Sequence, residues 1–190
     1  DPEVARAMLR GGVTSIGESQ LENILRLKAA GIYASYMLLR LPSLSEVEEV
    51  VSVADMSLNS ELTVLAGLSQ AAIRRDRKHD VIVMTDLGDL REGVWPPDLP
   101  AFMREAVQLP GIRIVGVGTN LACFGGVVPD EDNMRRLVQL ADSVAHVCGR
   151  PLEWISGVNS SGLVLLASGQ RPRRINHARI GEAILLGRET

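Results

Sequence analysis

The chain has 190 residues, of which 46% are hydrophobic and 23% charged, and its formal net charge is −3. This composition is ordinary for one globular α/β domain with a sizeable buried core. The basic residues are scattered and only 3% of the residues are aromatic, which argues against nucleic-acid binding. No apolar run approaches the ~18 residues of a membrane-spanning helix, and no signal-peptide pattern begins the sequence. We therefore expect a cytoplasmic protein without a membrane partner.

Short apolar, β-branched runs alternate with stretches of helical periodicity along the whole chain. In chain order we expect strands at 13–16, 36–40, 56–58, 80–86, 112–117, 152–156 and 174–180. Helices are expected at 1–10, 19–30, 43–54, 61–75, 99–109 and 130–147. Their expected start signals are Asp1, Ser43 with Glu46, Asn59 with Ser60, and Asp130.

Strands that alternate with helices predict a parallel sheet, because parallel neighbours need a long crossover connection. The seven strand-and-helix units are one short of the eight that close a (β/α)8 barrel. We therefore expect an α/β fold of the TIM-barrel type, incomplete here and comprising strands 2 to 8. A doubly wound open sheet is the alternative, although no G-x-G-x-x-G motif follows a strand.

Cysteine and histidine show no pattern of a metal site. Cys123 and Cys148 lack metal-ligand spacing and are expected to be reduced thiols. His79, His146 and His177 have no helical ligand spacing, so each is expected in a loop or at the surface. No bound metal is expected.

Polar residues stand at the ends of several predicted strands, where barrel enzymes carry their sites. The candidates are Arg40, Asn59, Asp86, Arg91, Asn120 and Arg179. Arg91 is expected either to bind a carboxylate or phenolate, or to pair with Asp86, Asp89 or Glu92. Arg179 is expected inside the last strand, where a buried cation needs an acidic partner or a ligand atom.

Two loops suit an anion. The loops after strands seven and eight of a barrel commonly hold a phosphate group, and here they are 157–162 and 180–182. The first offers hydroxyls and glycine N–H groups, and the second lies where a helix begins. We expect both loops to meet at one phosphate.

Four motifs, at 85–93, 116–126, 157–161 and 179–187, together resemble the alanine/ornithine racemase family of fold-type III pyridoxal-phosphate enzymes. The resemblance covers essentially the whole chain and is closest to the ornithine racemase-like branch. It implies that residues 1–190 are a partial pyridoxal-phosphate-binding barrel domain, of the alanine racemase N-terminal type. The implied activity is racemisation of a free amino acid, through a lysine aldimine and removal of the Cα proton.

The resemblance also implies roles for individual residues. Arg179 matches an arginine that faces the pyridine nitrogen of the cofactor, and Arg91 matches one near the phenolic oxygen and the substrate carboxylate. Asn120 takes the position of a histidine that lies against the ring in alanine racemases, and Met84 that of a lysine that supports the arginine. The implied phosphate-binding groups are Ser160 and the backbone N–H groups of Gly181 and Glu182, and Asn159 is implied as a further cofactor-binding residue.

Neither proton-transfer residue of the family is expected within these 190 residues. The resemblance places the Schiff-base lysine shortly upstream of Asp1, and Lys28 and Lys78 stand in the wrong places to replace it. It places the second acid/base group, a tyrosine, beyond Thr190 in the C-terminal domain of a partner subunit, which implies a homodimer. Activity of these residues alone is therefore not expected.

Several alternatives remain open from sequence. Ornithine or a similar basic amino acid is the expected substrate. A non-catalytic pyridoxal-phosphate homeostasis protein of the same fold is a second possible function, and a truncated, inactive form is a third. An incomplete barrel leaves two sheet edges unpaired, so we expect the chain to self-associate or to be poorly soluble.

Overall fold

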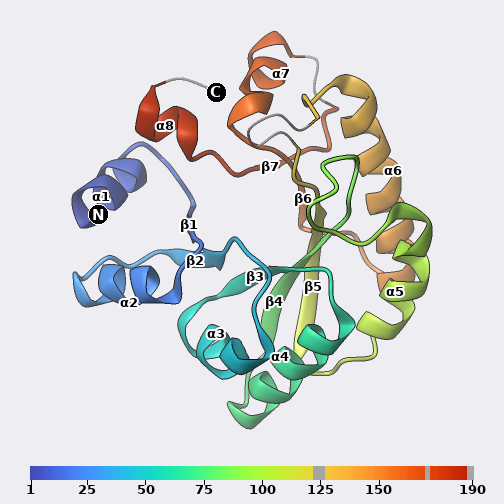
Figure 1. The fold of residues 1–190 in the computed structure, drawn as a ribbon, viewed down its shortest axis with the longest axis horizontal. Helices are drawn as coiled ribbons and strands as arrows, with labels where there is room; N and C mark the ends of the chain where they lie inside the picture. Colours follow the sequence, from blue (N-terminus) through green and yellow to red (C-terminus); the bar gives the residue numbers. More distant parts are fainter. Residues whose placement is uncertain (122–126, 170–171, 188–190) are drawn as a thin grey trace. The chain divides into compact units, whose positions relative to one another are not determined.

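The computed structural model describes residues 1–121, 127–169 and 172–187 (Figure 1). By its internal contacts the chain divides into two units. The first comprises Asp1–Val81 with Leu109–Arg113, and the second comprises Ile82–Gln108 with Ile114–Thr190. The fourth and fifth strands contribute residues to both units.

The strands of the described residues follow one another in the sheet in the order of the sequence. They are β1 (Ser15–Glu18), β2 (Ser35–Leu38), β3 (Met56–Asn59), β4 (His79–Met84), β5 (Ile112–Gly118), β6 (Trp154–Val158) and β7 (His177–Ala178). Parallel pairing joins β1 to β2, β2 to β3, β5 to β6 and β6 to β7. A doubly wound sheet would reverse its strand order at a switch point. The strand order is instead that of consecutive barrel strands, which confirms an α/β fold of the incomplete (β/α)8 type.

Helices occupy most of the connections. They are α1 (Pro2–Arg10), α2 (Leu21–Ala29), α3 (Val47–Val53), α4 (Leu62–Arg74), α5 (Leu99–Ala106), α6 (Glu131–Cys148), α7 (Leu163–Ser168) and α8 (Glu182–Leu186). Short 3₁₀ turns precede three of them, at Leu44–Glu46, Pro96–Asp98 and Ser160–Gly162.

Three of the four expected helix starts are confirmed. Asp1 accepts hydrogen bonds from the N–H groups of Glu3 and Val4, while Ser43 and Glu46 form a capping box. Asp130 caps α6 by accepting from the N–H of Asn133 at 2.7 Å. The expected cap at Asn59 and Ser60 is wrong, because α4 begins after Glu61 without a side-chain cap.

Each unit has its own apolar core. In the first unit, α2, α3 and α4 contact one another in sequence, and the buried side chains include Ile24, Tyr36, Val50, Leu58 and Leu65. In the second, α5 contacts α6 and α6 contacts β6 (Figure 1). A Cβ atom on Gly157 would lie 2.7 Å from the sulfur of Met134 and 2.8 Å from Leu137, so glycine lets α6 approach β6 closely.

Two expectations about histidine are wrong. His79 is fully buried at the start of β4, where its Nε2 lies 2.8 Å from the Ser57 hydroxyl. His177 stands in β7, with Nδ1 2.7 Å from the hydroxyl of Ser156. Sequence spacing gave no sign of these serine partners, because each lies in the neighbouring strand. His146 is exposed on α6, as expected.

The remaining general expectations concern thiols, metals and membranes. Cys148 is a free, half-buried thiol whose pKa is raised by burial, whereas Cys123 lies outside the described residues. Within the described ranges, no group of three or more acidic, histidine or cysteine side chains could hold a metal ion. None of the helices in the described part of the chain has the length and apolar character that crossing a bilayer requires.

Candidate functional site

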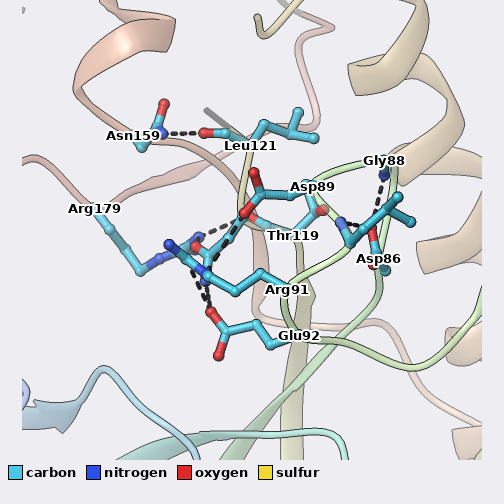
Figure 2. Close-up of polar contacts among 11 residues, drawn as sticks. Asp86, Gly88, Asp89, Arg91, Glu92, Thr119, Leu121, Asn159 and Arg179 are labelled. Carbon is cyan, nitrogen blue, oxygen red and sulfur yellow. Dashed lines mark hydrogen bonds and ion pairs between the residues drawn. The ribbon is translucent and has the colours of Figure 1, made fainter. Parts of the chain in front are cut away.

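The loop after β4 is shaped by Asp86. Its carboxylate accepts hydrogen bonds from the N–H groups of Gly88 at 2.7 Å and Leu90 at 3.2 Å. The backbone is left-handed at Gly88, with φ +128°, and at Leu90, with φ +53°. A leucine in this conformation is uncommon and is retained only where its surroundings demand it. Asp86 is thus a loop-forming residue, and the loop projects Arg91 beyond it (Figure 2).

Arg91 is held by the two acids that flank it. Its Nη2 donates to Glu92 Oε1 at 3.1 Å, and its Nε lies 3.6 Å from the carboxylate of Asp89. The side chain of Arg91 is 49% exposed, whereas those of Asp89 and Glu92 are 8% and 15% exposed. Asp89 and Glu92, two of the three acids expected as ion-pair partners, therefore pair with Arg91. Because the guanidinium is half exposed, an anion arriving from solvent can reach its fork of donors.

Arg179 follows β7 rather than lying inside it, so the expected strand position is wrong. Its backbone N–H still bonds to the carbonyl of Val158 at 2.7 Å, which fixes the residue beside β6. The guanidinium donates to the carbonyl and hydroxyl oxygens of Ser156 through Nη1, and to the Thr119 carbonyl at 2.7 Å through Nη2. The same Nη2 donates to the side-chain oxygen of Asn120 at 2.6 Å.

Asn120 connects the two arginines. Its Oδ1 accepts from Arg179, and its Nδ2 donates to Glu92 Oε1, which also accepts from Arg91. Figure 2 shows the side chains of Arg179 and Arg91 directed toward this acid from opposite sides. Burial lowers the pKa of Arg179 to about 10, with Glu92 raising it and Arg91 lowering it further. Arg179 therefore stays protonated at neutral pH.

The two loops expected to hold an anion do meet. Ser160 is 7% exposed, and its Oγ accepts a hydrogen bond from the N–H of Ala183 at 3.1 Å. Ala183 lies in the first turn of α8, directly after Gly181 and Glu182. The first N–H groups of a helix have no acceptor within the helix. A serine hydroxyl and a helix start therefore lie together at this point.

Asn159 shapes the first of these loops. Its Oδ1 accepts from Ser161 Oγ at 2.6 Å and from the N–H of Gly162 at 3.2 Å, and its Nδ2 donates to the carbonyl of Leu121. These bonds link the loop after β6 to the loop after β5 (Figure 2). Both ends of the amide thus have protein partners.

Three other candidates make contacts of a different kind. Arg40, in the first unit, donates to both carboxylate oxygens of Glu46, at 2.8 and 2.5 Å. Asn59 is buried in the same unit and donates to Ser57 Oγ at 2.9 Å. Met84 is fully buried and brings no charge to Arg91. The site that the structure assembles lies within the second unit.

Sequence reasoning missed Ser156 and Thr119 as partners of Arg179, and it named Glu92 only as one possible partner of Arg91. Ser156 lies in the middle of β6 and Thr119 directly follows β5, and both are buried polar residues. Since buried polar groups need hydrogen-bond partners, a polar residue beside buried apolar residues in the sequence could have indicated a partner for Arg179. The Thr119 hydroxyl has no partner among the described residues.

Comparison with known proteins was made at the levels of family, sequence and structure. The model of the family "Alanine racemase, N-terminal domain" matches residues 2–189. The chain is 44% identical over 179 residues to the ornithine racemase of Acetoanaerobium sticklandii, covering 94% of this chain and 50% of that protein. It is 39% identical over 189 residues to the lysine racemase of Thermotoga maritima, covering 100% of this chain and 52% of that protein. The chain thus spans about half the length of these curated relatives.

Solved structures show the same fold. The alanine racemase of Clostridium difficile 630 superposes with a TM-score of 0.78 at 18% identity, over 96% of this chain and 50% of that chain. PipY of Synechococcus elongatus PCC7942, solved with PLP bound, superposes with a TM-score of 0.77 at 18% identity, over 96% of this chain and 86% of that chain. At these identities the likeness establishes fold alone.

Proposed function

Because this chain belongs to the alanine racemase N-terminal domain family, we propose that the protein containing it is a pyridoxal-phosphate-dependent racemase of a free amino acid. The observation that carries the proposal is the hydrogen bond between Ser160 and Ala183. It joins the two loops expected to share a phosphate, and Arg179 lies between them in sequence. The curated relatives named as racemases support the same class of reaction.

The residues present fit the phosphate end of the cofactor. Ser160 Oγ accepts from Ala183, so its hydroxyl proton can be directed to an anionic oxygen. The N–H groups of Gly181 and Glu182, beside it at the start of α8, would add donors. Asn159 would contribute by holding the loop in shape, because both ends of its amide are engaged.

Arg179 and Asn120 would face the ring of the cofactor. A guanidinium has only donors, so Arg179 would hydrogen-bond to the pyridine nitrogen and keep it unprotonated. Its pKa of about 10 leaves it charged at neutral pH, and its four bonds to the protein hold it in one orientation. The bound cofactor would supply the conjugated ring that acidifies the Cα proton of the substrate.

Arg91 would bind the substrate carboxylate and lie near the phenolic oxygen. Its half-exposed guanidinium suits a two-pronged contact with a carboxylate, and its flanking acids limit its movement. We propose ornithine or lysine as substrate class, since the relatives at 44% and 39% identity carry these names.

Neither lysine of this chain is proposed as the covalent partner of the cofactor. Lys28 donates to the carbonyl of Val53 at 2.7 Å, and Lys78 is exposed before β4. Borohydride reduction of the full-length protein with pyridoxal phosphate, followed by peptide mapping, should label a lysine other than these two. Label on either would overturn this assignment. A homodimer is proposed on the resemblance alone, and sedimentation would test it. A cytoplasmic location is proposed on the sequence pattern alone, and cell fractionation would test it.

If Ser160 binds the phosphate, its removal should weaken the binding of pyridoxal phosphate. Ser160→Ala in the full-length protein should raise the dissociation constant for pyridoxal phosphate about ten- to a hundredfold, since a hydrogen bond to a charged group contributes roughly 1.5–3 kcal/mol. Fluorescence titration measures the constant. Ser143→Ala, an exposed serine on α6 of the same unit, is the matched control. Equal affinity of Ser160→Ala and wild type would contradict the role of Ser160.

A second function of the same fold stays open. PipY, solved with PLP bound, shares the fold of this chain. A non-catalytic pyridoxal-phosphate homeostasis protein is therefore the alternative. Chiral chromatography of ornithine and lysine incubated with the full-length protein separates the two, because only a racemase interconverts the enantiomers.

A further inference from the structure

Glu92 lies where the contacts of both arginines meet. It accepts from Arg91 directly at 3.1 Å and from Asn120, whose other end accepts from Arg179. Its side chain is only 15% exposed. A largely buried carboxylate needs charged or hydrogen-bonding partners, and here these are the two groups that face the proposed cofactor.

Glu92 and Arg179 hold Asn120 from its two ends. An asparagine amide has an oxygen that only accepts and a nitrogen that only donates. Glu92 only accepts and Arg179 only donates, so together they fix the nitrogen toward Glu92 and the oxygen toward Arg179. With a neutral side chain at 92, Arg179 alone would orient the amide, and the charge-assisted bond at its other end would be lost.

Glu92 also separates two like charges. Arg91 lowers the pKa of Arg179 and Glu92 raises it, so the three charged groups interact electrostatically as one cluster. Without the carboxylate the two guanidinium groups would repel one another. The position of each would then depend on its remaining contacts.

We propose that Glu92 is a positioning residue that aligns both cofactor-facing arginines, Arg91 by direct contact and Arg179 through the Asn120 amide. The inference rests on the proposed function. Loss of Glu92 should therefore have two separate effects, one on the binding of the substrate carboxylate and one on the contact with the ring of the cofactor. Neither part requires Glu92 to touch cofactor or substrate.

Glu92→Gln in the full-length protein tests the proposal. We expect kcat/KM to fall about ten- to a hundredfold, with a rise in KM through Arg91. We also expect the pH profile of the bound cofactor's visible absorbance to shift through Arg179, which is a readout independent of turnover. A merely structural role would lower thermal stability without moving this profile.

Two further variants separate the effect through Arg179 from the effect through Arg91. Asn120→Ala breaks the link to Arg179 and should shift the absorbance profile. Asp89→Asn weakens only the hold on Arg91 and should raise KM while leaving the profile unchanged. Glu105→Gln, at an exposed acid on α5 of the same unit, should match wild type in both.

The outcomes distinguish this inference from the proposed function on which it rests. If wild type binds pyridoxal phosphate and Glu92→Gln has the same absorbance profile as wild type, the inference is overturned and the proposed function stands. An absorbance profile that stays unmoved in Asn120→Ala would do the same. Wild-type protein that binds no pyridoxal phosphate would overturn both.

Discussion

Buried histidines are the residues whose environment sequence reasoning placed least well. The Ser57 hydroxyl accepts from Asn59 Nδ2 and lies 2.8 Å from Nε2 of His79. The other ring nitrogen of His79, Nδ1, is buried and has no partner among the described residues. Burial, followed by the nearby Arg77, lowers the pKa of His79 to about 4. Burial and Arg179 lower that of His177 to about 4 as well.

These depressed pKa values predict acid sensitivity. The unfolded chain takes up protons near pH 6.5 while folded His79 does not until about pH 4, so stability is complete above pH 6.5 and is lost as the pH falls toward 4. His79 should account for about 2 kcal/mol of the unfolding free energy lost between pH 7 and pH 5. His79→Gln should reduce this loss in urea unfolding, with part remaining from His177. The exposed His146→Gln is the control, and an unchanged pH difference in His79→Gln would refute the assignment.

Among the elements, the loop at 85–94 is held closely at its base. The Thr85 hydroxyl donates to the carbonyl of Val94 at 2.9 Å, which closes the loop at its base. Gly93 has φ +121°, and a Cβ there would lie 2.5 Å from the backbone nitrogen of Asp86. Backbone atoms cannot move aside as a flexible side chain can. The loop that presents Arg91 and Glu92 therefore requires glycine at 93.

Gly93→Ala should consequently lower the unfolding free energy by more than about 3 kcal/mol, since a positive φ and a backbone clash combine. Gly12→Ala provides the comparison, because Gly12 has φ +94° but a Cβ added there would meet no atom within 4 Å. That substitution should cost only about 1–2 kcal/mol. Chemical denaturation measures both. Similar losses in the two variants would show that the clash at 93 is relieved.

At the scale of the molecule, β1 and β7 are the end strands of the sheet order. Each pairs with one neighbour in the described residues, β1 with β2 and β7 with β6. Unpaired strand edges present N–H and C=O groups to other chains. Self-association of these residues therefore stays a prediction.

Residues 1–190 produced by themselves should elute as more than a monomer, or aggregate, in size-exclusion chromatography with light scattering. Raising the protein concentration should increase the fraction of larger species, because edge pairing between chains follows mass action. A monodisperse monomer at every concentration would contradict the prediction.

Interactions between residues close together in the sequence were enough to predict much of this protein's structure. The caps at Asp1, Ser43 and Asp130 depend on neighbours two or three residues away, and the alternation of strands and helices depends on periodicity within each segment. The family resemblance, the fold class and the support for pyridoxal phosphate likewise followed from residues read in order. The site assignments carry over from the same motifs and remain proposals.

Tertiary structure decided which side chains meet. Arg179 finds Ser156 and Thr119 at sequence separations of 23 and 60 residues, and Glu92 finds Asn120 at 28. His79 likewise finds Ser57 at 22 residues. Such partners are set by the register of neighbouring strands and the path of a loop, which depend on packing across the sheet rather than on any one segment. That is why the sequence could name the two arginines but only the fold could join them through Glu92.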